Sequence, residues 1–229
     1  MTSAAPVLVA VAHGTSSPAG RSAIGSLVAA VAARRPDLTV RAAFVDVQPP
    51  GPAAVLSSLD ETVPARLVPL LLSAGYHVYV DLAEAAAAVP GTTVAPALGP
   101  DDRLAGLLLR RLVAAGLRDD DVVVLGAAGS SQPSAVVDCE RVAAALGDLI
   151  GRPVVAGFLS AAEPKLANAV AAQRLPGRRV LVATYLLAPG FFADLAGRSG
   201  ADVVTGPLLL AGEPAPQELV DVVVERYLS

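Results

Sequence analysis

The sequence is poor in the residues that build several common kinds of functional site. Among its 229 residues there is a single cysteine, Cys139, no tryptophan and only 3% aromatic residues. One cysteine excludes an internal disulfide framework and any zinc or iron–sulfur site that several cysteines hold. The scarcity of aromatic side chains argues against a platform on which single-stranded nucleic acid stacks.

Basic charge and long apolar runs are also scarce. The 17 basic residues include one lysine, Lys165, and the net charge is −4. This charge balance does not resemble that of a protein with a basic surface for nucleic acid. No run of about 18 apolar residues occurs, and no basic segment precedes the first apolar run, Val7–Ala12. We therefore expect no nucleic-acid partner, no membrane span and a cytoplasmic location, which the low cysteine content also fits.

What the sequence does contain is an alternation of two kinds of apolar segment. Short runs rich in Val and Leu alternate with longer Ala/Leu-rich stretches, and hydrophobic residues make up 54% of the chain. The short runs are continuous rather than alternating, which is typical of parallel strands covered on both faces. The fold class is therefore α/β, with right-handed crossovers. In the first half we expect strands at 7–12, 39–45, 66–72 and near Thr93, and helices at 21–35, 52–59, 80–88 and 101–115.

The chain then repeats itself. Three landmarks recur at a nearly constant offset of 114 or 115 residues: His13–Ser16 at Ala128–Ser131, Phe44–Val45 at Phe158–Leu159, and Leu72–His77 at Leu187–Phe192. We predict two tandem flavodoxin-like halves, each a four-stranded parallel sheet with helices on both faces. The N-terminal half would span residues 1–117 and the C-terminal half residues 118–229.

The only two histidines follow strands that this fold makes neighbours. His13 directly follows the first strand, and His77 follows the third. With the strand order 2-1-3-4, the chain winds in opposite directions from these two strands, and ligands bind in the crevice at their carboxyl ends. Asp46 follows the second strand, on the other side of the first. The alternative, that all three are ordinary loop residues, stays open at this point.

Two imidazoles and a carboxylate form a chemically specific set. Neutral imidazole suits iron, cobalt, nickel and zinc, and three protein ligands leave coordination positions open for a metal that must be passed on. Imidazoles also accept protons near neutral pH. In the second half these three positions hold Ala128, Ser160 and Phe192, so the candidate ligands are lost together. We expect one metal site per chain, with the degenerate second half closing the cleft.

These residues carry a resemblance to a known family. The segments Val9–Thr15, Phe44–Asp46 with Pro49–Pro50, and Val68–Val78 followed by Asp81 resemble the sirohydrochlorin chelatases of the CbiX/SirB type. The resemblance covers nearly the whole chain, including the tandem halves and the loss of histidine from the second. It implies the class II tetrapyrrole chelatase fold.

The resemblance also implies an activity. Such an enzyme inserts a divalent metal into sirohydrochlorin, with Fe²⁺ for sirohaem favoured here and Co²⁺ for the anaerobic cobalamin route as the alternative. His13 and His77 would be the metal-binding and proton-accepting pair. Asp46 falls where the family usually has a glutamate after Phe-Leu, and this departure shortens the side chain by one methylene. The metal would be a substrate, with no permanently bound cofactor, and we expect a monomer.

The macrocycle would lie in the cleft between the halves. On the first half we expect it to contact Gly14, Thr15, Ser16, Gly75 and Tyr76, and on the second half Ser130, Phe191 and Phe192. The two phenylalanines would offer apolar area, unless they are ordinary core residues. Hydroxyl groups and helix N-termini would meet the substrate's carboxylates. Arg21 is the nearest basic candidate, unless it is an ordinary solvated helix residue, and Lys165 is a similar candidate in the second half.

Other classes of protein fit the sequence less well. A carrier that binds metal or tetrapyrrole without catalysis would need the same ligands, although retention of both histidines and a carboxylate favours the enzyme. A serine hydrolase fits poorly, because no Gly-x-Ser-x-Gly turn is present and the second half has no histidine for a triad. A dinucleotide-binding enzyme also fits poorly, because no G-x-G-x-x-G follows a strand.

Overall fold

The computed structural model describes residues 5–60, 63–73 and 76–229, and the side chains of the last range from residue 80 onward. The chain divides into two compact units. Unit 1 comprises Met1–Leu98 together with Gly212–Ser229, and unit 2 comprises Gly99–Ala211. None of the helices in the described residues is long and apolar enough to cross a membrane.

Unit 1 is a parallel sheet with helices on both faces, as predicted. Its strand order is β2-β1-β3-β4, and every pair is parallel. The strands are β1 (Val7–Ala12), β2 (Val40–Phe44), β3 (Ala65–Pro69) and β4 (Thr93–Val94). The helices are α1 (Pro18–Arg34), α2 (Pro52–Ser57), α3 (Tyr76–Ala87) and α8 (Gln217–Leu228).

The continuous apolar run of β1 explains its place inside this sheet. All six of its residues are buried. Val7, Val9 and Val11 share one core cluster with Leu56 of α2 and Leu82 of α3. Because side chains alternate along a strand, the residues between them face the opposite side of the sheet. A strand buried on both faces needs apolar residues at every position, and β1 supplies them.

Unit 2 repeats this architecture. Its strand order is β6-β5-β7-β8, again all parallel. The strands are β5 (Val122–Ala127), β6 (Val154–Phe158), β7 (Val180–Tyr185) and β8 (Val203–Val204). The helices are α4 (Asp102–Ala114), α5 (Pro133–Ile150), α6 (Leu166–Ala172) and α7 (Phe191–Ala196). The predicted fold class and the tandem repeat are both confirmed.

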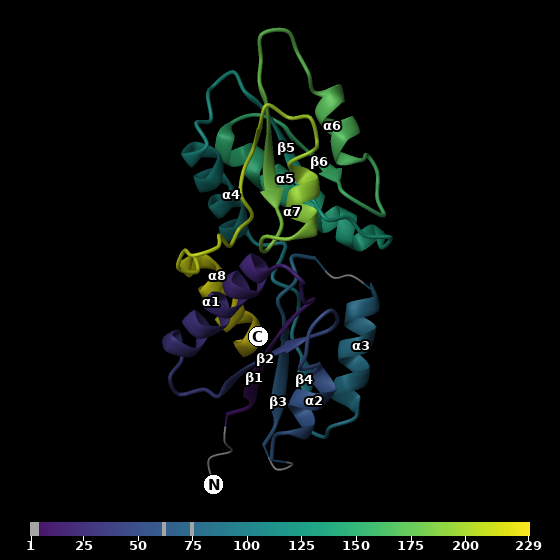
Figure 1. The fold of residues 1–229 in the computed structure, drawn as a ribbon, viewed down its shortest axis with the longest axis vertical. Coiled ribbons are helices and arrows are strands. Elements are labelled where there is room, and N and C mark those ends of the chain that lie inside the picture. Colours follow the sequence, from purple (N-terminus) through teal and green to yellow (C-terminus); the bar gives the residue numbers. More distant parts are fainter. Residues whose placement is uncertain (1–4, 61–62, 74–75) are drawn as a thin grey trace. The chain divides into compact units, whose positions relative to one another are not determined.

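The compact units do not follow the repeat boundaries at 1–117 and 118–229. Helix α4 belongs by sequence to the first repeat but packs against α5 and β7 of unit 2. Helix α8 belongs to the second repeat but packs against α1 and β3 of unit 1, where Figure 1 shows it in yellow beside α1. The two repeats therefore exchange their last helices. A sequence pattern gives the apolar face of each helix but not the sheet that the face covers.

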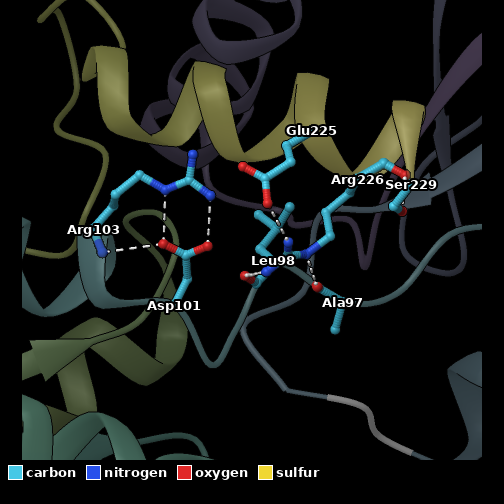
Figure 2. Close-up of polar contacts among 7 residues, drawn as sticks. All are labelled: Ala97, Leu98, Asp101, Arg103, Glu225, Arg226 and Ser229. Carbon is cyan, nitrogen blue, oxygen red and sulfur yellow. Dashed lines mark hydrogen bonds and ion pairs between the residues drawn. The ribbon is translucent and has the colours of Figure 1, made fainter.

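Equivalent arginines hold the two exchanged helices in place. Arg226 of α8 donates through Nε to the carbonyl of Ala97 (2.9 Å) and through Nη2 to that of Leu98 (3.1 Å; Figure 2). Arg111 of α4 donates to the carbonyl of Leu208 (3.0 Å). Leu98 and Leu208 occupy matching positions, because their N–H groups donate to the carbonyls of Leu71 and Leu186, which lie at matching positions after β3 and β7. Each helix is thus docked on the segment that follows the last strand of its sheet.

The start of α4 is fixed by its own cap. The side chain of Asp101 accepts hydrogen bonds from the N–H of Arg103 (3.0 Å) and from its guanidinium at 2.8 and 2.7 Å, the fork drawn in Figure 2. An aspartate at this position satisfies a donor that the first turn leaves free.

One predicted boundary was wrong in a way that affects the candidate site. The sequence predicted a helix from residue 80, but α3 begins at Tyr76. His77 therefore lies in the first turn of a helix rather than in the loop before it. The apolar, partly β-branched residues that begin this helix favour a strand or loop by propensity alone, which is why the pattern placed the start too late.

Candidate functional site

The loops that follow β1 and β2 are joined by backbone hydrogen bonds. The parallel register pairs Ala12 with Phe44 at the ends of these strands. Beyond it, the N–H of Val45 donates to the carbonyl of Ala12 (3.0 Å), and the N–H of Asp46 donates to the carbonyl of His13 (2.9 Å). The structure therefore places His13 and Asp46 on adjoining loops at the same edge of the sheet, as predicted.

Gly14 allows this close approach. Its φ is +99°, and a methyl group at its Cα would overlap the carbonyl oxygen of Asp46. A side chain is disfavoured here on two counts, because positive φ also brings Cβ against the backbone. Gly14 is thus needed for the two loops to lie against each other, and it is only half-buried.

Asp46 opens a tight turn. The N–H of Gln48 donates to the carbonyl of Asp46 (2.7 Å) across Val47, whose φ is +66°. A bond from residue i+2 to residue i across a residue of positive φ is a γ-turn, which a β-branched residue rarely adopts. The carboxylate of Asp46 accepts from the N–H of Val47 at 2.7 Å and is otherwise exposed. Its role as a turn former is therefore visible, and its role as a metal ligand remains a prediction.

The peptide groups of Thr15 are held by two long side chains. Its N–H donates to Oε1 of Gln48 (3.1 Å), and its carbonyl accepts from Nε of Arg21 (2.9 Å). Its hydroxyl accepts from the N–H of Ser17 (3.1 Å), while the neighbouring Ser16 is exposed. Sequence reasoning missed Gln48. Its position two residues after Asp46, in a loop already singled out, was the available signal.

The backbone of His77 lies beyond β3, the strand that pairs with β1 on the side opposite to β2. Strand β3 pairs with β1 in register, Val11 beside Pro69, and the first turn of α3 that carries His77 follows it. The side chains of Tyr76 and His77 are not among those described, and Gly75 lies outside the described residues. The described residues hold no group of three potential metal ligands. The predicted cluster needs the His77 side chain, so it stays a prediction.

The second repeat keeps the loop geometry without the ligands. The N–H of Ser160 donates to the carbonyl of Ala128 (2.9 Å), as Asp46 does to His13. Gly129 has φ +91°, and a methyl group there would overlap the carbonyl of Ser160. Ala161 has φ +51° in a matching γ-turn. The backbone arrangement is thus independent of the candidate ligands.

The candidate substrate contacts of the second repeat are accessible. Phe191 and Phe192 begin α7 and are 75% and 38% exposed, with their rings edge to face at a centroid distance of 5.7 Å. They are therefore not core residues. Ser130 is half-buried, and its hydroxyl accepts from the N–H of Gln132 (3.1 Å).

Of the two basic candidates, only one lies on the His13 loop. Arg21 is exposed and touches that loop through Thr15. Lys165 donates to the carbonyl of Ala162 (2.9 Å) and lies 3.4 Å from a carboxylate oxygen of Glu163. The charge of Lys165 is therefore already partnered within its own loop.

Comparison with protein families gives a match in each repeat. The family model CbiX matches residues 7–115 and, separately, residues 122–211. The two matches correspond to the tandem repeats. A comparison with curated proteins gave no significant match.

Several solved structures share the fold over nearly their whole length. SirB from Bacillus subtilis with Fe³⁺ has a TM-score of 0.76 at 19% identity, covering 96% of this chain and 93% of that one. The cobalt complex of SirB from Bacillus subtilis subspecies spizizenii has a TM-score of 0.77 at 17% identity, covering 97% and 94%. CbiX, described as the terminal enzyme of sirohaem biosynthesis in denitrifying bacteria, has a TM-score of 0.70 at 23% identity, covering 96% and 98%.

Proposed function

The chain belongs to the CbiX family of sirohydrochlorin chelatases, and on this basis we propose that it inserts a divalent metal ion into sirohydrochlorin. The observation that carries the proposal is the position of the only two histidines. Both follow neighbouring strands, β1 and β3, at the point where the chain turns in opposite directions. This is where ligands bind in open parallel sheets.

The two imidazoles would hold the metal ion on its way into the ring. His13 is exposed, so a hydrated ion can reach it without any unfolding. Two nitrogen ligands leave most coordination positions of the ion to water and to the incoming pyrrole nitrogens. An open site of this kind favours transfer over retention, which is what a metal substrate requires.

The same residues would manage the protons. Insertion forms bonds between the divalent metal ion and the ring nitrogens and releases two protons from pyrrole N–H groups. The two protons carry away the two positive charges that the metal brings, so the metallated ring has the same charge as the free ring. A histidine that has handed over its metal has a free nitrogen lone pair and can accept one of these protons. Ligand and base are therefore successive roles of one side chain.

Asp46 would assist from the adjoining loop. One carboxylate oxygen already accepts from the N–H of Val47, which fixes the direction of the group. A carboxylate has further lone pairs for a metal, a water or a proton. We propose that it lowers the cost of bringing a cation to His13.

Substrate contacts would come from both repeats. The first would contribute Gly14, Thr15, Ser16, Gly75 and Tyr76, and the second Ser130 with the exposed pair Phe191 and Phe192. The phenylalanines offer apolar area to the macrocycle, and their exposure supports this use.

We favour Fe²⁺ as the metal. The related SirB and CbiX structures concern iron and sirohaem in two cases and cobalt in one. The cobalt complex keeps Co²⁺ as the second candidate. Both ions suit imidazole ligands, so the residues of the chain do not separate them.

The test is anaerobic metal insertion into sirohydrochlorin, followed by absorbance, with Fe²⁺, Co²⁺ and Ni²⁺ in parallel. We expect acceleration over the uncatalysed rate and its loss in His13→Ala and His77→Ala. Asp46→Ala should slow the reaction, whereas the matched variant Ser160→Ala should not. Tight binding of the tetrapyrrole without acceleration by any metal would instead identify a carrier.

A further inference from the structure

The two repeats differ in how they hold the loop after their first strand. The equivalent positions are fixed by matching backbone bonds: Arg21 and Val136 both donate to the residue that precedes their helix, and Gln48 and Ala162 both close a γ-turn. In the first repeat, side chains at these positions bond both peptide groups of Thr15. In the second repeat the side chains of Val136 and Ala162 have no polar atom, so they form no such bonds.

This difference coincides with the loss of histidine. The loop bonded by Gln48 and Arg21 carries His13, and the loop without these side chains carries Ala128 instead. The γ-turns, the positive-φ glycines and the bonds between adjoining loops occur in both repeats. Folding alone therefore needs those shared features, and the extra side chains are found only where the candidate ligand is.

From this we propose that Gln48 and Arg21 are positioning residues, which fix the loop of His13 for metal transfer. The inference rests on the proposed function and deepens it. His13 is separated from Thr15 only by Gly14, which by itself allows wide backbone rotation. Hydrogen bonds at the carbonyl of His13 and at both peptide groups of Thr15 restrict the backbone rotation on either side of Gly14.

The bonds differ in strength and exposure. The Gln48 amide is half-buried and accepts a neutral backbone N–H at 3.1 Å, whereas the exposed Arg21 donates a charged N–H at 2.9 Å. Water competes more with the exposed bond from Arg21, so the bond to Gln48 should contribute more to fixing the loop of His13. Transfer geometry is sensitive to shifts of about 1 Å, which is why a bond two residues away affects the rate.

The test uses the whole 229-residue chain and its two histidines, whose ring C–H signals can be assigned by NMR from His13→Ala and His77→Ala. We expect Gln48→Ala to lower kcat for metal insertion by roughly 10- to 100-fold with the KM for sirohydrochlorin unchanged. The same variant should shift or broaden the His13 signal and leave the His77 signal in place. Gln48→Glu, which keeps an acceptor oxygen, should restore both properties.

Arg21→Ala should have a smaller effect in the same direction, and it remains available should Gln48→Ala fail to fold. Ser160→Ala is the matched control, because it removes the side-chain bond to the carbonyl of Ala128 (3.0 Å) in the second repeat; it should change neither kcat nor the His13 signal. An unchanged His13 signal or an unchanged kcat in Gln48→Ala overturns the inference. If the wild-type chain inserts no metal, the proposed function fails, and the His13 signal alone decides whether Gln48 positions this loop.

Discussion

The two repeats have the same backbone and different chemistry. Each has a parallel sheet of matching strand order, a glycine of positive φ after its first strand and a γ-turn after its second. Only the first carries histidine at the ends of its strands. The fold therefore depends on buried apolar strands and on glycine, and the candidate metal site is a small set of side chains added to it.

The two units also differ in the contacts made by the residues that directly precede their central strands. In unit 2, Asp121 before β5 forms a double hydrogen bond with Arg179 before β7, at 2.9 and 2.6 Å. The equivalent positions in unit 1 are Pro6 and Pro64. There the hydroxyl of Tyr227 on α8 donates to the carbonyl of Pro6 (2.7 Å). Unit 1 therefore relies on its exchanged helix where unit 2 has an ion pair.

The largest expected effect comes from ending the chain after Ala211. Helix α8 buries five apolar side chains in unit 1, namely those of Leu219, Val220, Val222, Val223 and Tyr227. At about 2 kcal/mol each, their loss removes about 10 kcal/mol, which is comparable to the whole stability of a domain. We expect unit 1 to unfold while unit 2 stays folded. Hydrogen exchange resolved by peptide checks this, and equal protection of unit 1 with and without α8 would contradict it.

Breaking the ion pair of unit 2 should have the next largest effect. Arg179→Ala leaves Asp121, which is 2% exposed, without its cationic partner, at a cost of about 3 kcal/mol. The hydrogen bonds from Arg179, with that from the N–H of Arg118, hold the pKa of Asp121 below its ordinary value. The stabilisation is thus present above about pH 4 and is lost as the pH falls through the lower folded pKa. The free energies of unfolding of the wild type and of Arg179→Ala, measured by denaturant titration, should therefore converge in acid.

Adding a methyl group at each of the two equivalent glycines distinguishes an effect on stability from an effect on metal insertion. Gly14→Ala and Gly129→Ala should each cost at least about 2 kcal/mol, because each combines positive φ with overlap on a carbonyl oxygen. Gly14→Ala should impair metal insertion more than Gly129→Ala, since only the loop of Gly14 carries histidine. The comparison is made on the folded fraction of each variant, and equal loss of activity in both would contradict the division of labour.

Removing the arginines of the exchanged helices should have a smaller effect. Arg226→Ala loses two hydrogen bonds from a charged group to backbone carbonyls, at a cost of about 2 kcal/mol. The loss should lower the unfolding midpoint of unit 1 more than that of unit 2, and Arg111→Ala should do the reverse. Calorimetry with assignment of the two units by hydrogen exchange measures both shifts.

The smallest effect on stability should come from the exposed aromatic pair. Phe191→Ala removes a side chain that is 75% exposed, so the free energy of unfolding should change by less than about 0.5 kcal/mol. The KM for sirohydrochlorin should nevertheless rise, because apolar area is lost from the proposed contact. An unchanged KM would remove Phe191 from the substrate contacts.

Much of the fold was predictable because buried parallel strands have a distinctive pattern. The run Val7–Ala12 and its repeat at 122–127 are apolar at nearly every position, and the strand order follows from the topology that such runs favour. The exchange of α4 and α8 was not predictable, because their apolar faces are alike at matching positions. Either helix fits either sheet as far as its pattern shows.

The candidate site was predictable only in part. The positions of His13 and Asp46 on adjoining loops follow from strand order alone, and the structure confirms them. The contact of Gln48 with Thr15 depends on a turn through Val47 at positive φ, which a β-branched residue gives no reason to expect. The sequence therefore did not predict the part of the site that depends on a backbone conformation unusual for its residue type.

The exchange of helices also sets an order of events during synthesis. Unit 2 is one continuous stretch, Gly99–Ala211, whereas unit 1 needs Gly212–Ser229 to cover its sheet. We therefore expect unit 1, whose strands leave the ribosome first, to complete its core last. Until α8 arrives, the face of its sheet that this helix covers is exposed apolar surface, which chaperones bind and which favours aggregation. The unit that carries the histidines is thus expected to complete its fold after the other unit.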